Sequence, residues 1–267
     1  MNVALGWAVK TAIAVGLAIT AVACGSGGGG AANGTSSGNA SPATAEIGVL
    51  LMGNSHTSFN NLPGMVAAMI QAARPGKTVA AVEAPGWMFL DERIADSASL
   101  ALIRSRRWSA VVLQAQKYSA SGLYDYSTAE ANDWIKLARE AGAMPVMFPE
   151  WPRRGVAETQ RIYDLHVSIA RKTPACVAPI GQAWDLSVAR NPGIVLHAGD
   201  GNHAVAAGSF LAALVIAHTI TGTSPDDLPV FTQFGIDSDT QSKLRAVATE
   251  TVQTISPRLY CPDDRPL

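Results

Sequence analysis

Ser55 and His203 have the neighbours that a nucleophile and its base require. Ser55 lies in the segment GNSHT, residues 53–57, where an apolar run ends abruptly in small polar residues, and His203 ends the segment DGNH, residues 200–203. Nucleophilic catalysis by serine needs a base within hydrogen-bond reach and a group that orients the base. Since Asp200 shares a short loop with His203, its carboxylate can reach the imidazole and hold the Nδ1 proton. The two segments therefore predict a catalytic triad of Ser55, His203 and Asp200.

The elements that must position these residues are read from the apolar pattern. Short apolar runs fit strands that are buried on both faces, and their alternation with longer amphipathic stretches implies a parallel sheet with helices on both sides. The expected strands are Glu46–Met52, Lys77–Glu83, Ala110–Gln114, Met144–Phe148 and Cys176–Pro179. The expected helices are Leu62–Ala73, Asp91–Arg104, Thr128–Ala141, Ala157–Arg171, Gln182–Ala189, His203–Thr221 and Thr240–Thr254.

Polar residues also follow the other expected strands, at the edge where ligands of parallel sheets bind. Gly86 comes after Pro85 behind the second strand, and Gln114 closes the third. The backbone N–H groups of Ser55 and Gly86, with the side-chain amide of Gln114, could donate hydrogen bonds to an oxyanion on the substrate. Gln116, which carries the same amide, is the alternative to Gln114. The candidate substrate-binding residues at this edge are His56, Gln116, Trp87 and Trp151.

This order of residues resembles the SGNH (GDSL-type) hydrolase family over residues 46–222. That family has its serine directly after the first strand, a glycine after the second and a D-x-x-H segment near the end. Ser55, Gly86 and the pair Asp200 and His203 match these positions. The resemblance implies an α/β fold, a flavodoxin-like three-layer α/β/α sandwich with a mostly parallel five-stranded sheet. It also implies a serine esterase that hydrolyses small acyl-ester substrates through an acyl-enzyme, without a cofactor.

Two positions depart from the family pattern. The first block usually reads G-D-S, whereas this chain has Asn54 before Ser55; asparagine is a tolerated alternative in the superfamily. No G-x-N-D follows the third strand, where the family usually carries an asparagine, and Gln114 stands there instead. Because glutamine also ends in an NH₂ group, it can supply the missing oxyanion donor. The substitution bears on the expected rate more than on the reaction class.

The same segments allow two other interpretations. His197, Asp200 and His203 have ligand-like spacing, so a metal-dependent hydrolase would use them as ligands and leave Ser55 without a role. Alternatively, a non-catalytic binding protein tethered to a membrane could have kept the fold and lost the activity, which the missing asparagine would explain. Retention of all three triad residues favours the esterase over this binding protein, and we expect no metal.

The N-terminal part of the chain predicts an exported protein on a flexible tether. Lys10 is the only charge in residues 1–23, and the apolar run that follows it is too short to span a bilayer comfortably, so these residues resemble a signal peptide. Small residues before Cys24 resemble a lipobox, which would make Cys24 a lipidated membrane anchor; a secreted protein cut at an ordinary signal peptide is the alternative. Residues 24–45 are rich in Gly, Ser and Ala and uncharged, as in a linker, and residues 46–267 form the hydrolase domain.

Charge and cysteine content bear on the binding partners of the protein and on a possible disulfide. The formal net charge of −1 gives no sign of a nucleic-acid surface, and we expect a monomer whose partners are a small substrate and the membrane. In an exported protein, Cys176 and Cys261 can form a disulfide, and two separate thiols are the alternative.

The sequence favours substrates with short acyl groups, because no large apolar lid is evident. Acetylated carbohydrate, a lipid ester and a thioester are each compatible with the predicted site.

Overall fold

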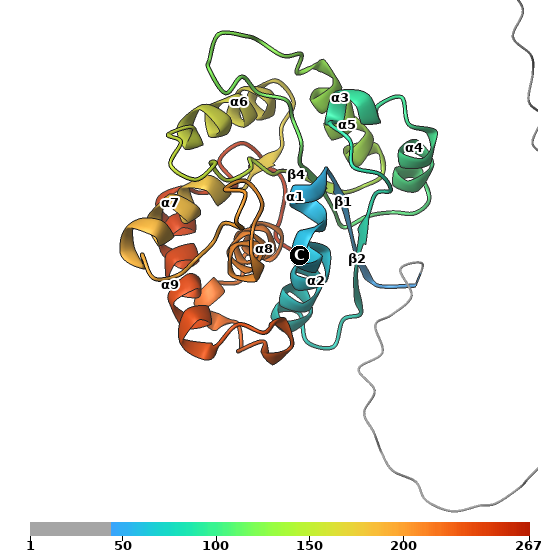
Figure 1. Ribbon diagram of the computed structural model, residues 1–267. Coiled ribbons are helices and arrows are strands. Elements are labelled where there is room, and N and C mark those ends of the chain that lie inside the picture. The colour runs from blue at the N-terminus through green and yellow to red at the C-terminus, as the bar shows by residue number, and fades with distance from the viewer. Residues whose placement is uncertain (1–43) are drawn as a thin grey trace, which may run out of the picture. The chain divides into compact units, whose positions relative to one another are not determined.

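The structure is a computed structural model that describes residues 44–267. A five-stranded sheet forms the centre of this described part (Figure 1). Every pair of neighbouring strands in it is parallel. The predicted signal peptide, Cys24 and the linker up to residue 43 lie outside the described residues. In spatial order the strands are β2 (Val79–Glu83), β1 (Ile47–Met52), β3 (Ala110–Leu113), β4 (Met144–Met147) and β5 (Cys176–Val177).

Both faces of the sheet are buried, which explains why its strands read as continuous apolar runs. Every residue of β1 is buried. Val49 and Leu51 belong to the apolar core on one face, whereas Leu50 and Met52 belong to the core on the other. Since the side chains of a strand alternate between its two faces, a strand in this position needs an apolar residue at every step.

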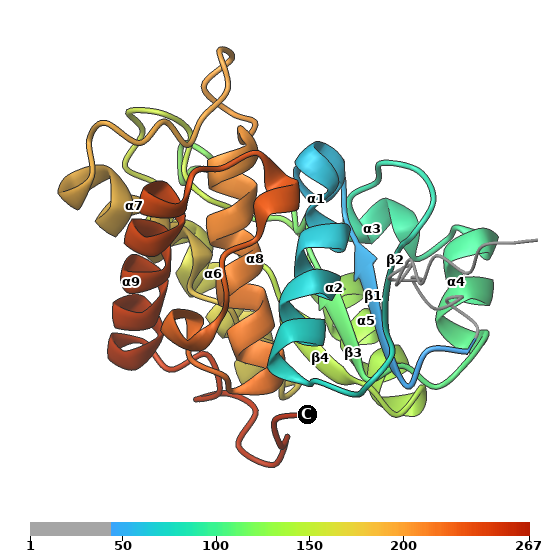
Figure 2. The same ribbon diagram turned by 90° about the horizontal axis from the view of Figure 1, so that it is seen from below.

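Helices cover the two faces as separate layers, so the predicted three-layer α/β/α sandwich is confirmed (Figure 1, Figure 2). One layer consists of α2 (Leu62–Ala73), α7 (Ile180–Arg190), α8 (Ala206–Thr221) and α9 (Ser238–Thr254). The other consists of α3 (Leu90–Arg93), α4 (Ser97–Arg104), α5 (Ala129–Glu140) and α6 (Thr159–Lys172). The short helix α1 (Ser55–Ser58) and the 3₁₀ turns Phe59–Asn61, Pro225–Asp227 and Thr232–Phe234 complete the described elements.

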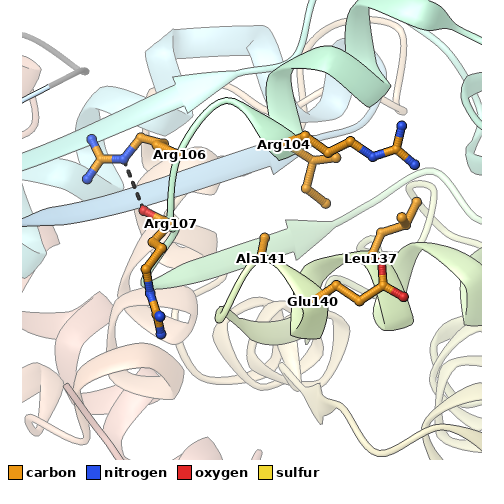
Figure 3. Close-up of a pocket in the computed structure, with 7 residues that line it drawn as sticks. Arg104, Arg106, Arg107, Leu137, Glu140 and Ala141 are labelled. Atoms are coloured by element: carbon orange, nitrogen blue, oxygen red, sulfur yellow. Dashed lines mark hydrogen bonds between the residues drawn. The ribbon is translucent and has the colours of Figure 1, made fainter.

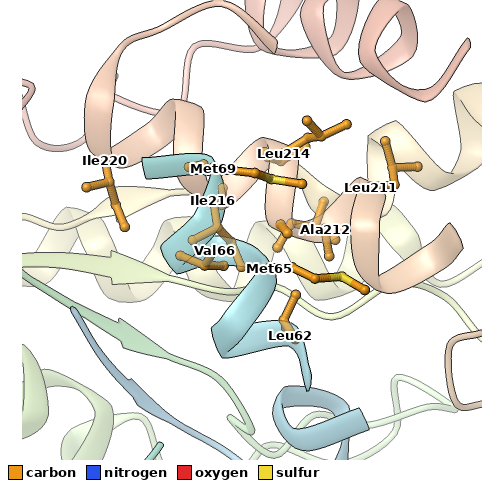
Figure 4. Packing of buried hydrophobic residues seen from close by; sticks show 14 of the residues in the cluster. Leu62, Met65, Val66, Met69, Leu211, Ala212, Leu214, Ile216 and Ile220 are labelled. Atoms are coloured by element: carbon orange, nitrogen blue, oxygen red, sulfur yellow. The ribbon is translucent and has the colours of Figure 1, made fainter. Parts of the chain in front are cut away.

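The apolar face of α2 packs against α8 (Figure 4). Leu62, Met65, Val66 and Met69 recur at helical spacing, so they form one stripe along α2. On α8 the same core contains Leu211, Ala212, Leu214, Ile216 and Ile220. α8 is apolar on nearly every side because it also contacts α7 and α9. Within residues 44–267 no helix, α8 included, combines the length and the apolar character needed to cross a membrane.

Two of the predicted helices differ from the structure by more than two residues. The predicted helix 91–104 is interrupted because Asp96 starts a new helix, its carboxylate accepting the N–H of Ser99 at 2.8 Å. α8 begins only at Ala206, since an antiparallel bridge forms in the loop before it. His203 therefore lies in a loop that is held by its own hydrogen bonds, and not in the first turn of the helix.

A disulfide between Cys176 and Cys261 joins the edge strand β5 to the C-terminal tail. The Cα atoms of the two cysteines lie 5.0 Å apart. Beside them, the N–H of Val177 donates to the carbonyl oxygen of Pro257 at 2.9 Å. Of the two alternatives for this pair, the bridge is the one present, and it fastens the tail along the sheet.

β1 and β3 lie at the point where the chain reverses its direction across the sheet. After β1 the chain runs to β2 at one edge, and it then returns to β3 on the other side of β1. In such doubly wound sheets, ligands bind in the crevice outside the carboxyl ends of these two strands. Ser55 follows β1 and Gln114 follows β3, so the candidate residues gather at this crevice.

Candidate active site

Three side chains from two distant segments form a continuous chain of hydrogen bonds. Ser55 Oγ lies 2.8 Å from His203 Nε2, and His203 Nδ1 lies 2.5 Å from Asp200 Oδ2. The other carboxylate oxygen accepts the N–H groups of Asn202 and His203 at 2.9 and 3.0 Å. The hydrogen bond from His203 holds the pKa of Asp200 well below its usual range, so the carboxylate stays ionised. The structure thus brings the three predicted triad residues within hydrogen-bond reach of one another.

A glycine and an asparagine shape the turn that carries Ser55. A Cβ atom on Gly53 would lie 2.1 Å from Thr57 Oγ1 and 2.3 Å from Gln114 Oε1, so no larger residue fits. Asn54 caps the short helix α1, because its side-chain oxygen accepts the N–H of the second helical residue at 3.0 Å. Ser55 is therefore the first residue of α1, and its hydroxyl lies at the rim of a pocket above the sheet edge.

The imidazole of His203 packs against two other rings. Phe59 stacks on it with 4.2 Å between ring centroids and 21° between the planes, and the ring of His56 lies 5.2 Å away. Burial, reinforced by the neighbouring His203, lowers the pKa of His56 to about 4, so His56 is neutral near pH 7. These contacts restrict rotation of the imidazole. In the sequence, Phe59 is marked only by its place one turn after Ser55.

Trp151 packs against the loop that carries His203 and does not line the pocket, which corrects the prediction that it binds substrate. Its ring is 2% exposed and stacks on Trp184 at 4.6 Å, and its indole N–H donates to the carbonyl of Asn202 at 2.8 Å. Arg154, which no motif in the sequence marks, donates to the carbonyl of His197 at 3.0 Å. The loop that carries the imidazole is therefore tied to the segment after β4.

Neither a family model nor a curated protein matches this sequence. Among solved structures, a candidate SGNH hydrolase from Slackia heliotrinireducens is similar, with 25% sequence identity and a TM-score of 0.53. The similarity covers 64% of this chain and 97% of that one. This chain has the fold of the SGNH hydrolases. The similarity supports a hydrolase of that fold.

Two further structures extend the comparison. A DUF4886 family protein from Bacteroides uniformis shares the fold at 16% identity and a TM-score of 0.61, over 82% of this chain and 96% of that one. TesA matches at 15% identity and a TM-score of 0.45, over 64% of this chain and 97% of its own.

Gln114 stands where the SGNH family usually carries an asparagine, but its amide is turned into the protein. Its Oε1 accepts the N–H of Asn54 at 2.9 Å and the hydroxyl of Thr57 at 3.1 Å. Its Nε2 donates to Glu150 Oε2 at 3.0 Å, and the side chain is fully buried. This position corrects the predicted role as an oxyanion donor, because the amide oxygen holds the serine turn and the NH₂ group donates to Glu150.

The other residues predicted at this edge also have roles of their own. Gln116 is buried and donates to two backbone carbonyls of the following loop, at 2.9 and 3.0 Å, so it orders that loop instead of facing a substrate. Trp87 is 63% exposed, and its indole N–H donates to Ser58 Oγ at 2.8 Å. Trp87 and Gly86 border a separate hollow beside the one that contains Ser55.

A pocket of about 620 Å³ opens beside the triad. Ser55, His203 and His56 border it, so His56 is the predicted substrate-binding residue that the structure does place there. The size and the mixture of apolar and polar walls are typical of a small-molecule site. The remaining walls combine aromatic and charged side chains, namely Phe89, Tyr118, Tyr126, Lys117, Glu150 and Arg153.

Carboxylates dominate the charge around this pocket. Lys117 forms ion pairs with two carboxylates of α3 at 2.8 and 3.0 Å, and Arg153 pairs with Glu158 at 2.7 Å. Glu150 has no ion-pair partner within the described part of the chain. Burial raises the pKa of Glu150 to about 7, against the opposing effect of the hydrogen bond from Gln114. The pocket therefore suits neutral or cationic groups better than anions.

A further hollow lies at the opposite edge of the sheet (Figure 3). Arg104, Arg106 and Arg107 border it just before β3 begins, together with Leu137 and Glu140 of α5. Since these segments precede β3 and β4, the hollow lies at the amino ends of the strands. Its lining contains neither a serine nor a histidine, so it offers no alternative place for the same chemistry.

His197 does not join Asp200 and His203, which bears on the metal alternative. Its Nε2 lies 2.8 Å from the carbonyl oxygen of Pro152, and its ring packs edge-on against Trp184 at 4.6 Å. Among the residues that the structure describes, these three side chains do not form a group within ligand distance. The arrangement therefore favours the serine chemistry over a metal held by this segment.

Proposed function

We propose that this protein is a serine esterase that hydrolyses acyl esters through an acyl-enzyme intermediate, with Ser55 as the nucleophile. The observation that carries the proposal is the chain of hydrogen bonds from Ser55 through His203 to Asp200. It lies at the carboxyl edge of a sheet with the SGNH fold. A protein that only binds its ligand has no need of that chain.

In the first step His203 acts as the general base. Its Nε2 takes the proton from Ser55 Oγ while Oγ attacks the carbonyl carbon of the ester, and Asp200 holds the Nδ1 proton of the imidazolium that forms. The backbone N–H groups of Ser55 and Gly86 donate to the oxyanion. His203 then gives its proton to the departing alcohol. A water molecule, activated by the same histidine, attacks the acyl group on Ser55 and releases the acid.

The substrate that fits this pocket best is a neutral, short acyl ester of a polar alcohol such as a carbohydrate. Phe89 and Tyr126 offer aromatic surface for the apolar face of a sugar ring. Glu150 and Asn202 offer hydrogen-bonding groups to hydroxyls. The carboxylates around the pocket would repel an anionic acyl group.

The proposal includes export and a lipid anchor at Cys24. It rests on the signal-like residues 1–23 and on the uncharged linker that follows. The disulfide between Cys176 and Cys261 supports it, because structural disulfides persist in oxidising compartments outside the cytosol. Incorporation of a palmitate analogue into wild type and equally into Cys24→Ala would contradict the anchor.

Hydrolysis of p-nitrophenyl esters with acyl chains of increasing length tests the esterase. Because Ser55 and His203 act in one step, Ser55→Ala and His203→Ala should each lower kcat by at least about 10³-fold. Asp200→Asn removes the charge that orients the imidazole and should cost roughly 10² to 10⁴-fold. A fluorophosphonate should inactivate the wild type by labelling Ser55, and a chelator should leave its activity unchanged.

Ser168, an exposed serine on α6, provides the matched control. Ser168→Ala should keep wild-type activity. A Ser55→Ala variant that is as active as the wild type would end the serine-esterase proposal, and chelator-sensitive activity would favour the metal alternative. If no protein in the set is active on a broad ester panel, the tethered binding protein becomes the better explanation.

A further inference from the structure

Arg93, the last residue of α3, is a fully buried cation that binds to backbone carbonyls of the site loops. Its guanidinium donates to the carbonyl oxygens of Gly53 at 2.8 Å, Pro85 at 2.9 Å and Gly86 at 2.5 Å. It also donates to Ser99 Oγ at 2.8 Å. A buried guanidinium is usually matched by a carboxylate, yet within residues 44–267 none lies within ion-pair distance of Arg93. Its partners are instead the turn before Ser55 and the turn after β2.

These bonds fix the direction of two peptide groups. No peptide bond in the described part of the chain is cis, and in a trans peptide the C=O and the N–H point in opposite directions. With the Gly53 carbonyl on the guanidinium, the N–H of Asn54 must point away from it, and that N–H does donate to Gln114. With the Pro85 carbonyl on the guanidinium, the N–H of Gly86 must likewise point away.

The peptides around Gly86 have little else to hold them. Gly86 is exposed and has a φ of 73°, a conformation that glycine exchanges with others at low cost. Within residues 44–267 its N–H has no acceptor, and Gly86 borders the hollow next to the one that contains Ser55. Because the amide of Gln114 is engaged with Glu150, the oxyanion depends on backbone donors, and their orientation matters more than in a site with a side-chain donor.

We propose that Arg93 is a positioning residue for the oxyanion hole: it holds the Pro85–Gly86 peptide with its N–H outward and ties that turn to the one that carries Ser55. This inference rests on the esterase proposed above. The cation also polarises each peptide that it binds, which strengthens the N–H on the far side as a donor. Arg93 touches neither substrate nor reacting atoms, and it acts only through the two turns.

Arg258 provides a matched control elsewhere in the fold. It is another partly buried arginine whose guanidinium donates to backbone carbonyls, those of Thr219 at 2.6 Å, Ile220 at 3.2 Å and Asp264 at 3.0 Å. These partners lie at the end of α8 and in the C-terminal tail. Loss of Arg258 therefore has a cost to stability that resembles the cost of losing Arg93, without any contact with the turns around Ser55.

The test compares kcat and KM of wild type, Arg93→Lys, Arg93→Ala and Arg258→Ala on the best nitrophenyl ester. Misorientation of an oxyanion donor lowers turnover, so both Arg93 variants should lose about 10- to 100-fold in kcat while KM changes by less than about 3-fold. Added guanidinium ion should restore part of the kcat of Arg93→Ala. Arg258→Ala should have a lower Tm, a wild-type kcat and no response to guanidinium.

Folded Arg93 variants with a wild-type kcat would overturn the proposal, and so would an equal loss of kcat in Arg258→Ala. If neither Arg93 variant folds, Ser99→Ala removes one acceptor of the guanidinium and should still lower kcat by about 2- to 5-fold, because the restraint on the arginine is weaker. An unchanged kcat in that variant would count against the proposal.

NMR spectra of the backbone amides test the positioning by Arg93 without any need for catalytic activity. The backbone amide resonances of Gly86 and Asn54 should shift in the Arg93 variants, or in Ser99→Ala, and remain in place in Arg258→Ala. If the wild type hydrolyses no ester but these resonances shift as expected, the proposed function fails and the positioning by Arg93 stands. If the wild type is active and the resonances do not move, the positioning fails alone.

Discussion

Glu150 is a carboxyl group that lines the serine pocket and has no ion-pair partner among the described residues. It borders the pocket and accepts one hydrogen bond from Gln114, whereas the nearby Lys117 and Arg153 are paired with other carboxylates. Burial raises its pKa to about 7. Near neutral pH the protein is therefore a mixture of molecules with a neutral and with an ionised Glu150, and the balance affects both the stability of the fold and the charge of the pocket.

Replacing Glu150 with glutamine should make stability less dependent on pH. The pKa of Glu150 is about 7 in the folded protein against an ordinary value of 4.5. Between these values the unfolded chain releases the proton and the folded protein keeps it, so the free energy of unfolding falls as the pH rises through this window. Glutamine does not titrate, so Glu150→Gln should gain up to about 3 kcal/mol on the wild type between about pH 5 and pH 8.

Urea unfolding of both proteins at the two pH values measures this gain. Glu140→Gln, at an exposed position of α5, is the control and should differ from the wild type by the same amount at both pH values. A pH-independent effect of Glu150→Gln would contradict a raised pKa of Glu150.

At the scale of residues, the sequence predicts the members of the candidate triad, but not the direction of the side chains around them. Asp200 and His203 share one short loop, so local spacing is enough to predict their contact. Gln114 is predicted at the correct strand end, yet its direction depends on Glu150, which follows β4 and meets it only once the sheet has formed. Arg93 carries no signal in the sequence, because its partners are backbone carbonyls of distant turns.

At the scale of elements, the long helices and the strands follow from apolar periodicity, and the short segments do not. α2 has the predicted bounds, and each predicted strand is present within a few residues. The helix predicted at 91–104 breaks because a side-chain cap competes with the apolar pattern. α1 has four residues, too few for any periodicity, although it carries Ser55, the proposed nucleophile. The residues at the site thus lie mostly where the pattern is weakest, in the connections between elements.

The packing of α8 on α7 offers a test of how elements support the histidine loop. A Cβ atom on Gly208 of α8 would lie 2.6 Å from the ring of Trp184 on α7 and 2.5 Å from the carbonyl oxygen of Leu196. Trp184 stacks on Trp151, whose indole N–H holds the loop at Asn202. Gly208→Ala should therefore destabilise the protein by about 1–3 kcal/mol and should also lower kcat, since displacement of the two rings moves the loop.

Thermal unfolding and ester hydrolysis measure the two effects of Gly208→Ala. Gly193→Ala is the control, because a Cβ atom there would meet nothing within 4 Å and the backbone is not left-handed. This control should match the wild type in both measurements. A Gly208→Ala protein with normal stability would mean that α8 and α7 can separate without cost, and one with reduced stability but normal kcat would disconnect the rings from the loop.

At the scale of the whole molecule, the candidate active site and the disulfide lie on different parts of the sheet. The triad and the turn after β2 gather around β1, whereas the disulfide lies at β5, beyond β3 and β4. The class of fold follows from the sequence because strand–helix alternation leaves few right-handed parallel topologies. The sequence leaves the pairing of Cys176 with Cys261 open, since the spacing of two distant cysteines does not show that they are close in space.

Removing the disulfide should lower stability and leave catalysis intact. The bridge closes a loop between residues 85 positions apart in the sequence, and in the chain-entropy model such a closure stabilises the fold by about 4.5 kcal/mol. For a domain of this size, that loss corresponds to a fall in Tm of about 10–15 °C. The double variant Cys176→Ala, Cys261→Ala should show this fall, with kcat at 25 °C within about 2-fold of wild type, because two strands separate β5 from the serine turn.

A reductant should lower the Tm of the wild type and leave that of the double variant unchanged, which separates loss of the bridge from loss of the sulfur atoms. A wild-type protein with two freely alkylatable thiols, or a double variant with an unchanged Tm, would show that the C-terminal tail is held by packing and hydrogen bonds alone.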